Sequence, residues 1–453
     1  MPARIFKSSL KFLFEHRKTG EKEKKMKAVI LTAGKGLRLR PMTATIPKPL
    51  LLVAGHSFLD HTIAKLVNIG VTEIILVVGH KAQEIKKYYE NHSFDVKISF
   101  ITQEEQLGTA HAFACAKPLI GQEAFIGLNG DVLISQTDFE KFGEKIKSFP
   151  NDLFVSAKAM KNPEIYGVFT VSQDYLVTGI FEKSPSPPSN LVNAGLYYFP
   201  SSIFKTIDAT PRSSRGEYEI TESINLKLMK KESVRLYELQ AYWLDIGMPW
   251  DLLSANELLL KEQEKISTID ASARIDNGAT LIGSIHVGAN VHIRAGAYIQ
   301  GPVYIDENAI VGPNCFIRAC TYLGKNVHIG NAVEIKNSII LEKTNIGHLS
   351  YIGDSVIGRY CNFGAGTKVA NLRLDNRSAK VKIKNKVIDS GHRKLGVFLG
   401  DNVKTGINSS LMGGIKIGPN SAIGAGMLIT RDIEPNTLVY RNSNDQIAVR
   451  KWP

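Results

Sequence analysis

The sequence lacks any apolar stretch long enough to cross a membrane, and it has few cysteines. No run of apolar residues approaches the roughly eighteen that a transmembrane helix needs, so a membrane-spanning protein is not expected. The four cysteines, Cys115, Cys315, Cys320 and Cys361, form no CxxC pair and have no secretory context. Reduced thiols in a cytoplasmic protein are therefore expected.

Acidic residues are also in deficit, and the chain carries a formal net charge of +13. Residues 1–27 hold nine lysines and arginines against three glutamates, which is a net +6. Much of the net positive charge therefore lies in residues 1–27. The mildly basic remainder suits a protein that handles phosphorylated small molecules, and no nucleic-acid partner is expected. We expect residues 1–25 to form a basic, disordered extension; a helix lying on a membrane surface is the alternative.

A branched aliphatic residue recurs every six residues in the C-terminal half. A period of six fits neither an α-helix nor the two-residue alternation of a strand. It is typical of short strands separated by regular corners, where each side directs one aliphatic side chain to a shared axis. Such units bury their apolar faces only by stacking, so a β-solenoid is predicted. The pattern comprises Ile275, Leu281, Val287, Ile293, Ile299, Ile305, Val311, Ile317, Leu323, Ile329 and Ile335, returns at Ile346, Ile352, Ile357 and Phe363, and runs again from Leu399 to Ile429.

The N-terminal half alternates strand and helix patterns. Residues 27–31 have the pattern of a buried strand and lead into a glycine-containing segment at 32–41. Helical periodicity follows over 59–69, and further strand patterns lie at 73–78 and 94–101. This alternation predicts a doubly wound, Rossmann-like α/β domain. A glycine loop after a strand lets the backbone approach a phosphate closely, although this loop is neither a Walker loop nor a complete GxGxxG.

Five segments are expected along the chain. The α/β domain takes residues 26–250 and the solenoid takes residues 266–436, with a connecting helix at 251–265. The extension 1–25 precedes them, and residues 437–453 form a polar C-terminal tail.

Six motifs between residues 26 and 250 together resemble the sugar-1-phosphate nucleotidylyltransferases. They are Gly34-x-Gly36-x-Arg38-Leu39-x-Pro41 with Pro47-Lys48-Pro49, Gln103-x-x-Gln106-Leu107-Gly108-Thr109-Ala110, Asn129-Gly130-Asp131, Tyr166-Gly167-Val168 with Glu182-Lys183, Asn193-Ala194-Gly195, and Trp243-Leu244-Asp245-Ile246-Gly247. The resemblance implies that a sugar-1-phosphate attacks the α-phosphorus of UTP or dTTP and expels pyrophosphate. Such transfers depend on positioning and on charge neutralisation.

The same resemblance assigns roles to individual residues. It implies that Arg38 and Lys48 are catalytic and that Asp131 and Asp245 hold Mg²⁺, a hard ion that suits carboxylate and phosphate oxygens. The residues expected around the nucleotide and the sugar are Ala33, Gly34, Gly36, Gln103, Gly108, Thr109, Gly167, Glu182 and Asn193. Leu37 and Met248 depart from the family pattern and leave the choice between UTP and dTTP open.

The break in the six-residue pattern resembles the acetyltransferase half of the bifunctional GlmU-type enzymes. The segments that carry the likeness are Gly347-His348-Leu349-Ser350-Tyr351-Ile352-Gly353-Asp354, Asn362-Phe363-Gly364-Ala365-Gly366-Thr367 and Ala370-Asn371. The resemblance implies a left-handed β-helix, a homotrimer with active sites between neighbouring prisms, and acetyl-CoA as the acyl donor. A basic segment with Lys380 follows Asn371, as in the archaeal version of the enzyme, and leaves glucosamine- or galactosamine-1-phosphate open as acceptor.

The roles implied in this half follow the chemistry of amine acetylation. His348 would be the general base, because an imidazole removes a proton near neutral pH. Arg318 and Lys336 would hold the sugar phosphate, and Tyr351 would position the thioester or the developing oxyanion. Asn362, Ala365, Asn371 and Lys380 are the other residues expected to bind substrate or acetyl-CoA; for Lys380 a solvated charged loop is the alternative.

Two other functions remain open at this point. The β-helix could be a structural or regulatory part of a monofunctional nucleotidylyltransferase, with His348 an exposed corner residue. The chain could also be an assembly subunit like the related components of the eukaryotic translation exchange factor. The presence of Arg38, Lys48, Asp131 and Asp245 argues against that last reading.

Overall fold

The structure, a computed structural model, describes residues 26–91, 94, 96–263 and 267–452. The predicted extension at 1–25 lies outside the described residues. The chain divides into two compact units. The first unit runs to Lys35 and also contains Pro47–Leu50 and Phe58–Asp245, whereas the second contains Gly36–Ile46, Leu51–Ser57 and Ile246–Pro453. In the part of the chain described, every helix is too short or too polar to cross a membrane.

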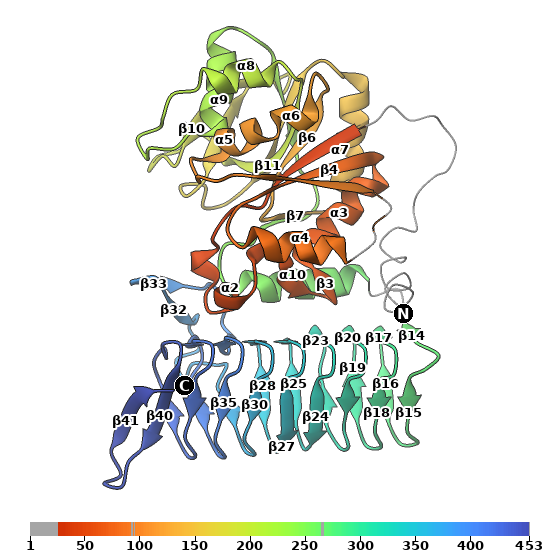
Figure 1. Cartoon of the computed structure of the whole chain (residues 1–453), viewed down its shortest axis with the longest axis vertical. Helices are drawn as coiled ribbons and strands as arrows, with labels where there is room; N and C mark the ends of the chain where they lie inside the picture. Colours follow the sequence, from red (N-terminus) through yellow and green to blue (C-terminus); the bar gives the residue numbers. More distant parts are fainter. Residues whose placement is uncertain (1–25, 92–93, 95, 264–266, 453) are drawn as a thin grey trace. The chain divides into compact units, whose positions relative to one another are not determined.

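A nine-stranded mixed sheet forms the centre of the first unit (Figure 1). Its main path runs β10-β9-β11-β6-β1-β4-β5, and β8 joins β11 to β12. Strands β6, β1, β4 and β5 are parallel, and β11 is antiparallel to β6. The strands are β1 (Met26–Leu31), β4 (Val71–Val78), β5 (Lys97–Thr102), β6 (Phe125–Asn129), β8 (Leu153–Ala159), β9 (Gly167–Val171), β10 (Val177–Glu182), β11 (Leu191–Phe199) and β12 (Val234–Glu238).

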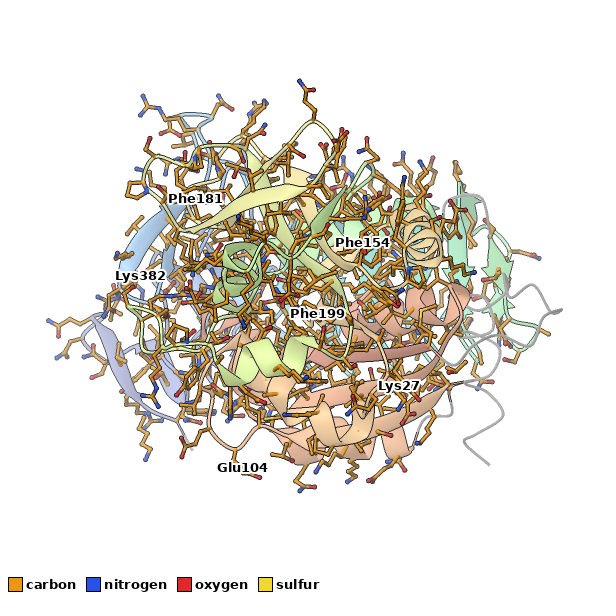
Figure 2. All side chains as sticks on the ribbon, turned by 90° about the horizontal axis from the view of Figure 1, so that it is seen from above. Lys27, Glu104, Phe154, Phe181, Phe199 and Lys382 are labelled. Carbon is orange, nitrogen blue, oxygen red and sulfur yellow. The ribbon has the colours of Figure 1, made fainter. Side chains whose placement is uncertain are left out.

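Helices cover both faces of this sheet, as the prediction of a doubly wound domain requires. One core contains residues of α3 (Phe58–Asn68), α4 (Ala82–Glu90) and α7 (Gln136–Ser148). The other contains residues of α5 (Thr109–Cys115), α6 (Lys117–Ile120), α8 (Ile203–Asp208) and α9 (Ile220–Met229). Side chains that alternate along one strand enter opposite cores, which explains the continuous apolar runs of the central strands. Phe154 belongs to the first core and Phe199 to the second (Figure 2).

The second unit contains a prism made of three sheets (Figure 1). Neighbouring strands in each sheet are parallel, except that β41 is antiparallel to β40. The first sheet is β14 (Thr268–Ile269), β17 (Ile285–Val287), β20 (Val303–Ile305), β23 (Thr321–Leu323), β26 (Ile339–Ile340), β29 (Val356–Ile357), β34 (Phe398–Leu399) and β37 (Lys416–Ile417). The second is β15 (Arg274–Ile275), β18 (His292–Ile293), β21 (Ile310–Val311), β24 (His328–Asn331), β27 (Asn345–His348), β30 (Asn362–Phe363), β35 (Lys404–Thr405), β38 (Ala422–Ile423), β40 (Thr437–Arg441) and β41 (Ile447–Lys451). The third is β16 (Thr280–Ile282), β19 (Tyr298–Gln300), β22 (Phe316–Ile317), β25 (Glu334–Lys336), β28 (Tyr351–Gly353), β31 (Lys368–Val369), β36 (Ser410–Leu411) and β39 (Leu428–Ile429).

The six-residue pattern is confirmed as the inner lining of this prism. The aliphatic residues from Val287 to Ile335 that the pattern selects are fully buried in one core. Ile275, in the first complete coil, is 38% exposed because no further coil covers it. At one corner of the prism the chain repeatedly adopts a left-handed conformation, for which asparagine is well suited. Asn402 and Asn420 are two such residues, and their side chains hydrogen-bond each other at 3.0 Å.

Helix α10 (Asp251–Glu262) occupies the place of the predicted connecting helix, and residues 264–266 of that prediction lie outside the described residues. Two later segments form strands that the sequence did not predict. The basic segment after Asn371 contains an antiparallel hairpin of β32 (Lys380–Ile383) and β33 (Lys386–Asp389). Residues 437–451, expected to be a tail, form β40 and β41 and extend the second sheet. Val439 is buried there, so this hairpin covers apolar surface at the end of the solenoid.

The remaining elements are short. In the second unit they are η2 (Leu37–Leu39), α2 (Met42–Thr45), β2 (Leu52–Val53) and β3 (His56–Ser57); in the first they are η3 (Lys48–Leu50), β7 (Val132–Ile134) and β13 (Trp243–Asp245). Three of them carry predicted site residues: Arg38 lies on η2, Lys48 on η3 and Asp245 on β13. The β2–β3 turn is held to the prism by Asn256 of α10, which is fully buried. Its Oδ1 accepts from the Ala54 amide at 2.8 Å, and its Nδ2 donates to the Cys320 carbonyl at 2.8 Å.

Candidate active sites

The predicted phosphate loop begins where β1 ends. The backbone amide and the hydroxyl of Thr32 both donate to the Val77 carbonyl at 2.9 Å, which fixes the loop to the end of β4. The Ala33 carbonyl accepts from the His80 amide at 3.1 Å and from Gln106 Nε2. Gly34 follows with open space at its Cβ position, so its backbone is accessible to a ligand.

The predicted catalytic lysine and the two predicted metal-binding carboxylates are Lys48, Asp131 and Asp245. Lys48 Nζ lies 2.9 Å from Asp131 Oδ2. Strands β7 and β13 pair antiparallel with Asp245 opposite Val132, so Asp131 and Asp245 occupy the same end of this two-stranded sheet. The chain reaches Asp131 only through a close approach at Gly130, where a Cβ would lie 2.2 Å from the Leu31 carbonyl oxygen.

The donor set at this point fits Mg²⁺. No group of three or more His, Cys, Asp or Glu side chains suited to a metal occurs among the residues described. Mg²⁺ is commonly held by one or two carboxylates and completes its octahedron with substrate phosphates and water. The carboxylates of Asp131 and Asp245 supply that minimal set.

The predicted nucleobase residues lie along the start of α5. Gln103 is buried, and its Nε2 donates to the Gly108 carbonyl at 3.2 Å and lies 3.0 Å from His111 Nδ1. Its amide nitrogen is therefore engaged within the protein. Thr109 Oγ1 accepts from the Ile220 amide at 2.9 Å, which ties α5 to α9.

The predicted sugar-binding residues come from adjacent strands of the first unit. Gly167 faces Glu182 across β9 and β10. Burial, with a contribution from the charge of Glu219, raises the pKa of Glu182 above its ordinary value. On β11, Asn193 Nδ2 donates to the Tyr197 hydroxyl at 2.8 Å.

Gly36 and Arg38 are the predicted nucleotidyl-transfer residues that belong to the second unit. Arg38 lies on η2 and is exposed, and its Nη2 is 3.1 Å from the Cβ position of Gly247. Thr43 Oγ1 donates to the Gly36 carbonyl at 2.7 Å and closes this turn.

In the prism, four predicted residues gather on the third sheet. Arg318 follows β22, Lys336 ends β25 and Tyr351 begins β28, so they stand on successive coils. Asn371 follows β31 on the next coil, and its Nδ2 donates to the Tyr351 hydroxyl at 3.0 Å. Burial raises the pKa of Tyr351, which therefore keeps its proton at neutral pH.

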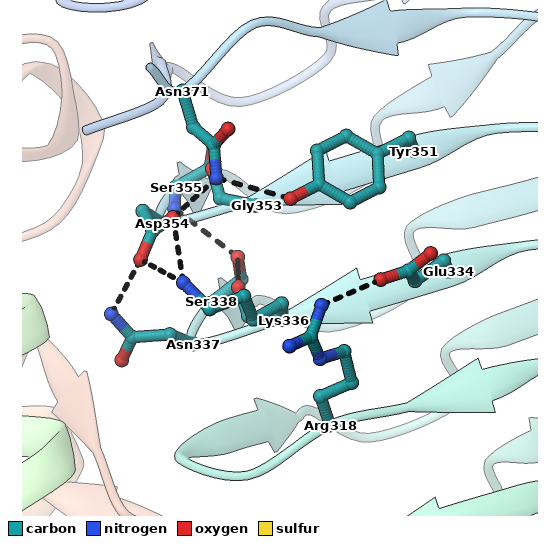
Figure 3. Close-up of polar contacts among 10 residues, drawn as sticks. All are labelled: Arg318, Glu334, Lys336, Asn337, Ser338, Tyr351, Gly353, Asp354, Ser355 and Asn371. Atoms are coloured by element: carbon teal, nitrogen blue, oxygen red, sulfur yellow. Dashed lines mark hydrogen bonds and ion pairs between the residues drawn. The ribbon is translucent and has the colours of Figure 1, made fainter. Parts of the chain in front are cut away.

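Two acidic residues complete this cluster (Figure 3). Arg318 Nη1 lies 2.9 Å from Glu334 Oε1. Lys336 Nζ lies 3.1 Å and 3.2 Å from the two carboxylate oxygens of Asp354. Both cations predicted to hold a sugar phosphate are thus already paired with a carboxylate.

His348 and Asn362 stand on the second sheet at adjacent coils. His348 ends β27 and is exposed, and no described residue forms a hydrogen bond or ion pair with its ring. Its carbonyl accepts from Ser350 Oγ at 2.8 Å and from the Gly366 amide at 3.3 Å, which holds the corner that leads to Tyr351. Asn362 accepts from Asn345 at 3.0 Å, Ala365 is half-buried on the same coil, and Lys380 is exposed on β32.

Comparisons with known proteins agree with this two-part organisation. Residues 27–262 match the family described as nucleotidyl transferase, residues 299–413 the GMPPB C-terminal domain, and residues 396–431 the hexapeptide repeat of succinyl-transferase. The bifunctional protein GlmU of Methanocaldococcus jannaschii is 43% identical, over 94% of this chain and 100% of its own length. The chain belongs to the GlmU family.

Two further relatives of the GlmU family support the same conclusion. GlmU of Methanococcus maripaludis strain C7 is 46% identical over 94% of this chain and 99% of its own. The bifunctional sugar-1-phosphate nucleotidylyltransferase/acetyltransferase of Sulfurisphaera tokodaii is 38% identical over 90% of this chain and 98% of its own. The chain is thus a transferase with a nucleotidyltransferase domain and a left-handed β-helix acetyltransferase domain. The predictions of fold and of bifunctional enzyme are confirmed.

The sequence reasoning assigned no role to Glu334 or Asp354. In a GlmU-family prism, residues one coil apart are neighbours, and Lys336 and Asp354 are 18 residues apart. A search of the sequence for opposite charges 18 residues apart would have identified this ion pair. Asp354 also lies in a left-handed conformation at a corner, which the sequence pattern marks only weakly.

Proposed function

We propose that the chain performs two successive reactions on a sugar phosphate. The β-helix acetylates an amino-sugar-1-phosphate, glucosamine- or galactosamine-1-phosphate, with acetyl-CoA. The α/β domain transfers a nucleotidyl group from UTP or dTTP to the resulting sugar-1-phosphate and releases pyrophosphate, giving UDP-N-acetylglucosamine in the uridine case. The observation that carries the proposal is the presence of two clusters: Lys48 with Asp131, and Lys336 joined through Asp354 to Asn371 and Tyr351.

In nucleotidyl transfer the protein positions charge and does no covalent chemistry. The backbone at Gly34 and Gly36 and the Arg38 side chain bind the triphosphate, while Lys48 stabilises the charge that develops at the α-phosphate. Asp131 and Asp245 would hold Mg²⁺, which would supply neutralisation of phosphate charge. Gln103, Gly108 and Thr109 line the base, and Gly167, Glu182 and Asn193 line the sugar.

In acetyl transfer the amine of the sugar attacks the thioester carbonyl carbon. The new C–N bond forms, the C–S bond breaks, His348 takes the ammonium proton, and the coenzyme A thiolate leaves and is protonated. Arg318 and Lys336 bind the phosphate with donors that their carboxylate partners do not use, since a guanidinium has five N–H groups and an ammonium three. Tyr351 donates to the thioester oxygen, and Asn362, Ala365, Asn371 and Lys380 line the substrate and the coenzyme.

The GlmU-family prism is proposed to work as a cytoplasmic homotrimer that binds small molecules and neither nucleic acid nor membrane. Exposed apolar side chains, Tyr298 and Leu428 on the third sheet and Met412 directly after β36, support a protein contact on that face. A native mass of about three times the 49.9 kDa of one chain is expected by light scattering. A monomer at micromolar concentration would remove this part of the proposal.

Reciprocal variants test the two activities. His348→Ala is expected to abolish release of the coenzyme A thiol with amino-sugar phosphates and to leave pyrophosphate release intact; Lys48→Ala should do the reverse. Four NTPs assayed against glucose-, glucosamine- and N-acetylglucosamine-1-phosphate, with and without acetyl-CoA, identify the substrates. Absence of thiol release from the wild type with both glucosamine- and galactosamine-1-phosphate would refute the acetylation step.

A further inference from the structure

We infer that Asp354 is a positioning residue for acetyl transfer, which orients a hydrogen-bond chain so that the Tyr351 hydroxyl donates its proton toward the substrate. The chain runs from the Asp354 carboxylate through the Asn371 amide to Tyr351 (Figure 3). The inference rests on the acetyl-transfer site proposed above.

Asp354 is held rigidly and out of solvent. It is 3% exposed and sits at a corner with φ +51°, in the left-handed region. Its amide donates to the Lys336 carbonyl at 2.9 Å, and its carbonyl accepts from the Gly396 amide at 2.8 Å. A carboxylate buried to this extent requires partners, and it has three: Lys336, Asn337 and Asn371.

The charge of Asp354 determines which atoms donate and which accept along this hydrogen-bond chain. An ionised carboxylate only accepts hydrogen bonds, so Asn371 must turn its Nδ2 toward Asp354, which it approaches to 2.5 Å. The second Nδ2 hydrogen then points to the Tyr351 oxygen at 3.0 Å. Because this oxygen accepts from Asn371, its own O–H is left to donate elsewhere. Asn371 Oδ1 has no donor among the described residues and faces away from Asp354 (Figure 3).

Gly353 provides the space for this arrangement. A Cβ at this position would lie 2.7 Å from the Tyr351 hydroxyl oxygen and 2.6 Å from Asn371 Nδ2. The phenol ring therefore reaches across the sheet to Asn371 only because residue 353 has no side chain. Donors fixed before the reaction stabilise an oxyanion most, since they need no reorganisation in the transition state.

Asp354→Asn tests the inference, because it keeps the size of the side chain and removes its obligatory acceptor character. The kcat of acetyl transfer is expected to fall about 10²-fold, as does the loss of one oxyanion donor. Tyr351→Phe should cause a loss of similar size. In the Tyr351→Phe background, adding Asp354→Asn should cost no more than about twofold, since residues that act as a unit are not additive. Asp354→Glu, which remains acceptor-only, should recover part of the lost rate.

The outcomes separate this inference from the proposed site. Full additivity of the two substitutions would overturn the role of Asp354 and leave the site intact. An unchanged rate in Tyr351→Phe would refute the proposed site itself. Pyrophosphate release by the same preparations verifies that the nucleotidyltransferase domain is folded. Thermal melting verifies that the prism is folded. If Asp354→Asn does not fold, Asn371→Ala interrupts the same hydrogen-bond chain. Its effect on the kcat of acetyl transfer must then be non-additive with that of Tyr351→Phe, or the inference fails.

Discussion

Asp138 offers a direct test of how the first unit holds Asp245 in place. This carboxylate is fully buried at the start of α7. It accepts from the Gln240 amide at 2.8 Å, the Ala241 amide at 2.9 Å, Ser135 Oγ at 2.8 Å and the Tyr237 hydroxyl at 3.2 Å. The amides belong to the loop that leads directly into β13, so Asp138→Ala should both destabilise the unit and loosen Asp245.

The expected loss of stability depends on which of the hydrogen-bond donors can bond to water once the Asp138 carboxylate is removed. Gln240 and Ala241 are exposed, so their amides can be hydrated once the carboxylate is gone, whereas Ser135 and Tyr237 are buried. Leaving two buried hydroxyls without their charged acceptor costs about 3 kcal/mol in the free energy of unfolding. For a unit of this size that corresponds to a fall in Tm of about 6–12 °C. Nucleotidyl transfer should require more Mg²⁺ for half-maximal rate, and acetyl transfer should be unchanged.

Calorimetry of the full chain and Mg²⁺ titrations of pyrophosphate release measure both effects. Asp174→Asn, at an exposed carboxylate of the same unit, is the matched control and should change stability by less than about 0.5 kcal/mol. A normal Mg²⁺ dependence in Asp138→Ala, together with the lower Tm, would show that Asp138 supports the fold without positioning Asp245. A Tm equal to that of the control would refute the reasoning altogether.

Three further outcomes are expected. Burial raises the pKa of Asp306 from 3.8 to about 6, so the stability linked to its protonation is mostly present at pH 4 and is lost as pH rises through 6. Asp306→Asn should therefore raise the stability of the prism by about 2.5 kcal/mol more at pH 8 than at pH 4. A pH-independent difference in urea unfolding would contradict this. Gly353→Ala should abolish acetyl transfer but not nucleotidyl transfer, because its Cβ would meet the Tyr351 hydroxyl; retained thiol release would argue against the site. Removal of Mg²⁺ with EDTA should stop nucleotidyl transfer and leave acetyl transfer unchanged, because Asp131 and Asp245 are the carboxylates proposed to hold the ion, whereas the carboxylates of the acetyl-transfer cluster are paired with Arg318 and Lys336; loss of both activities would contradict this assignment.

The local periodicity of the sequence was enough to predict both folds. A six-residue repeat of aliphatic side chains has one efficient way to bury itself, and the inner lining from Val287 to Ile335 follows it. The alternation of strand and helix similarly predicted the doubly wound sheet, because strands buried on both faces have continuous apolar runs. In the site, the motif order pointed to Lys48 and Asp131, which the structure places 2.9 Å apart.

Other features depended on contacts between distant segments. The hairpin β40–β41 follows the end of the six-residue pattern, and its role at the end of the core depends on the preceding coil to which β40 pairs. The segment Gly36–Ile46, which carries Arg38, clusters with the second unit although its sequence belongs to the nucleotidyltransferase pattern. Local pattern contains no information about either pairing.

By itself, then, the sequence determined the two architectures and the kinds of residue available for two chemistries, because periodicity and motif order are properties of neighbouring residues. Only the tertiary structure decided how those residues are paired. Asp354 meets Lys336 because the chain completes one coil between them. Asp138 accepts hydrogen bonds from the loop before Asp245 because the fold brings the start of α7 beside that loop. Hydrogen bonds act over about 3 Å, so these partners exist only once the chain has folded.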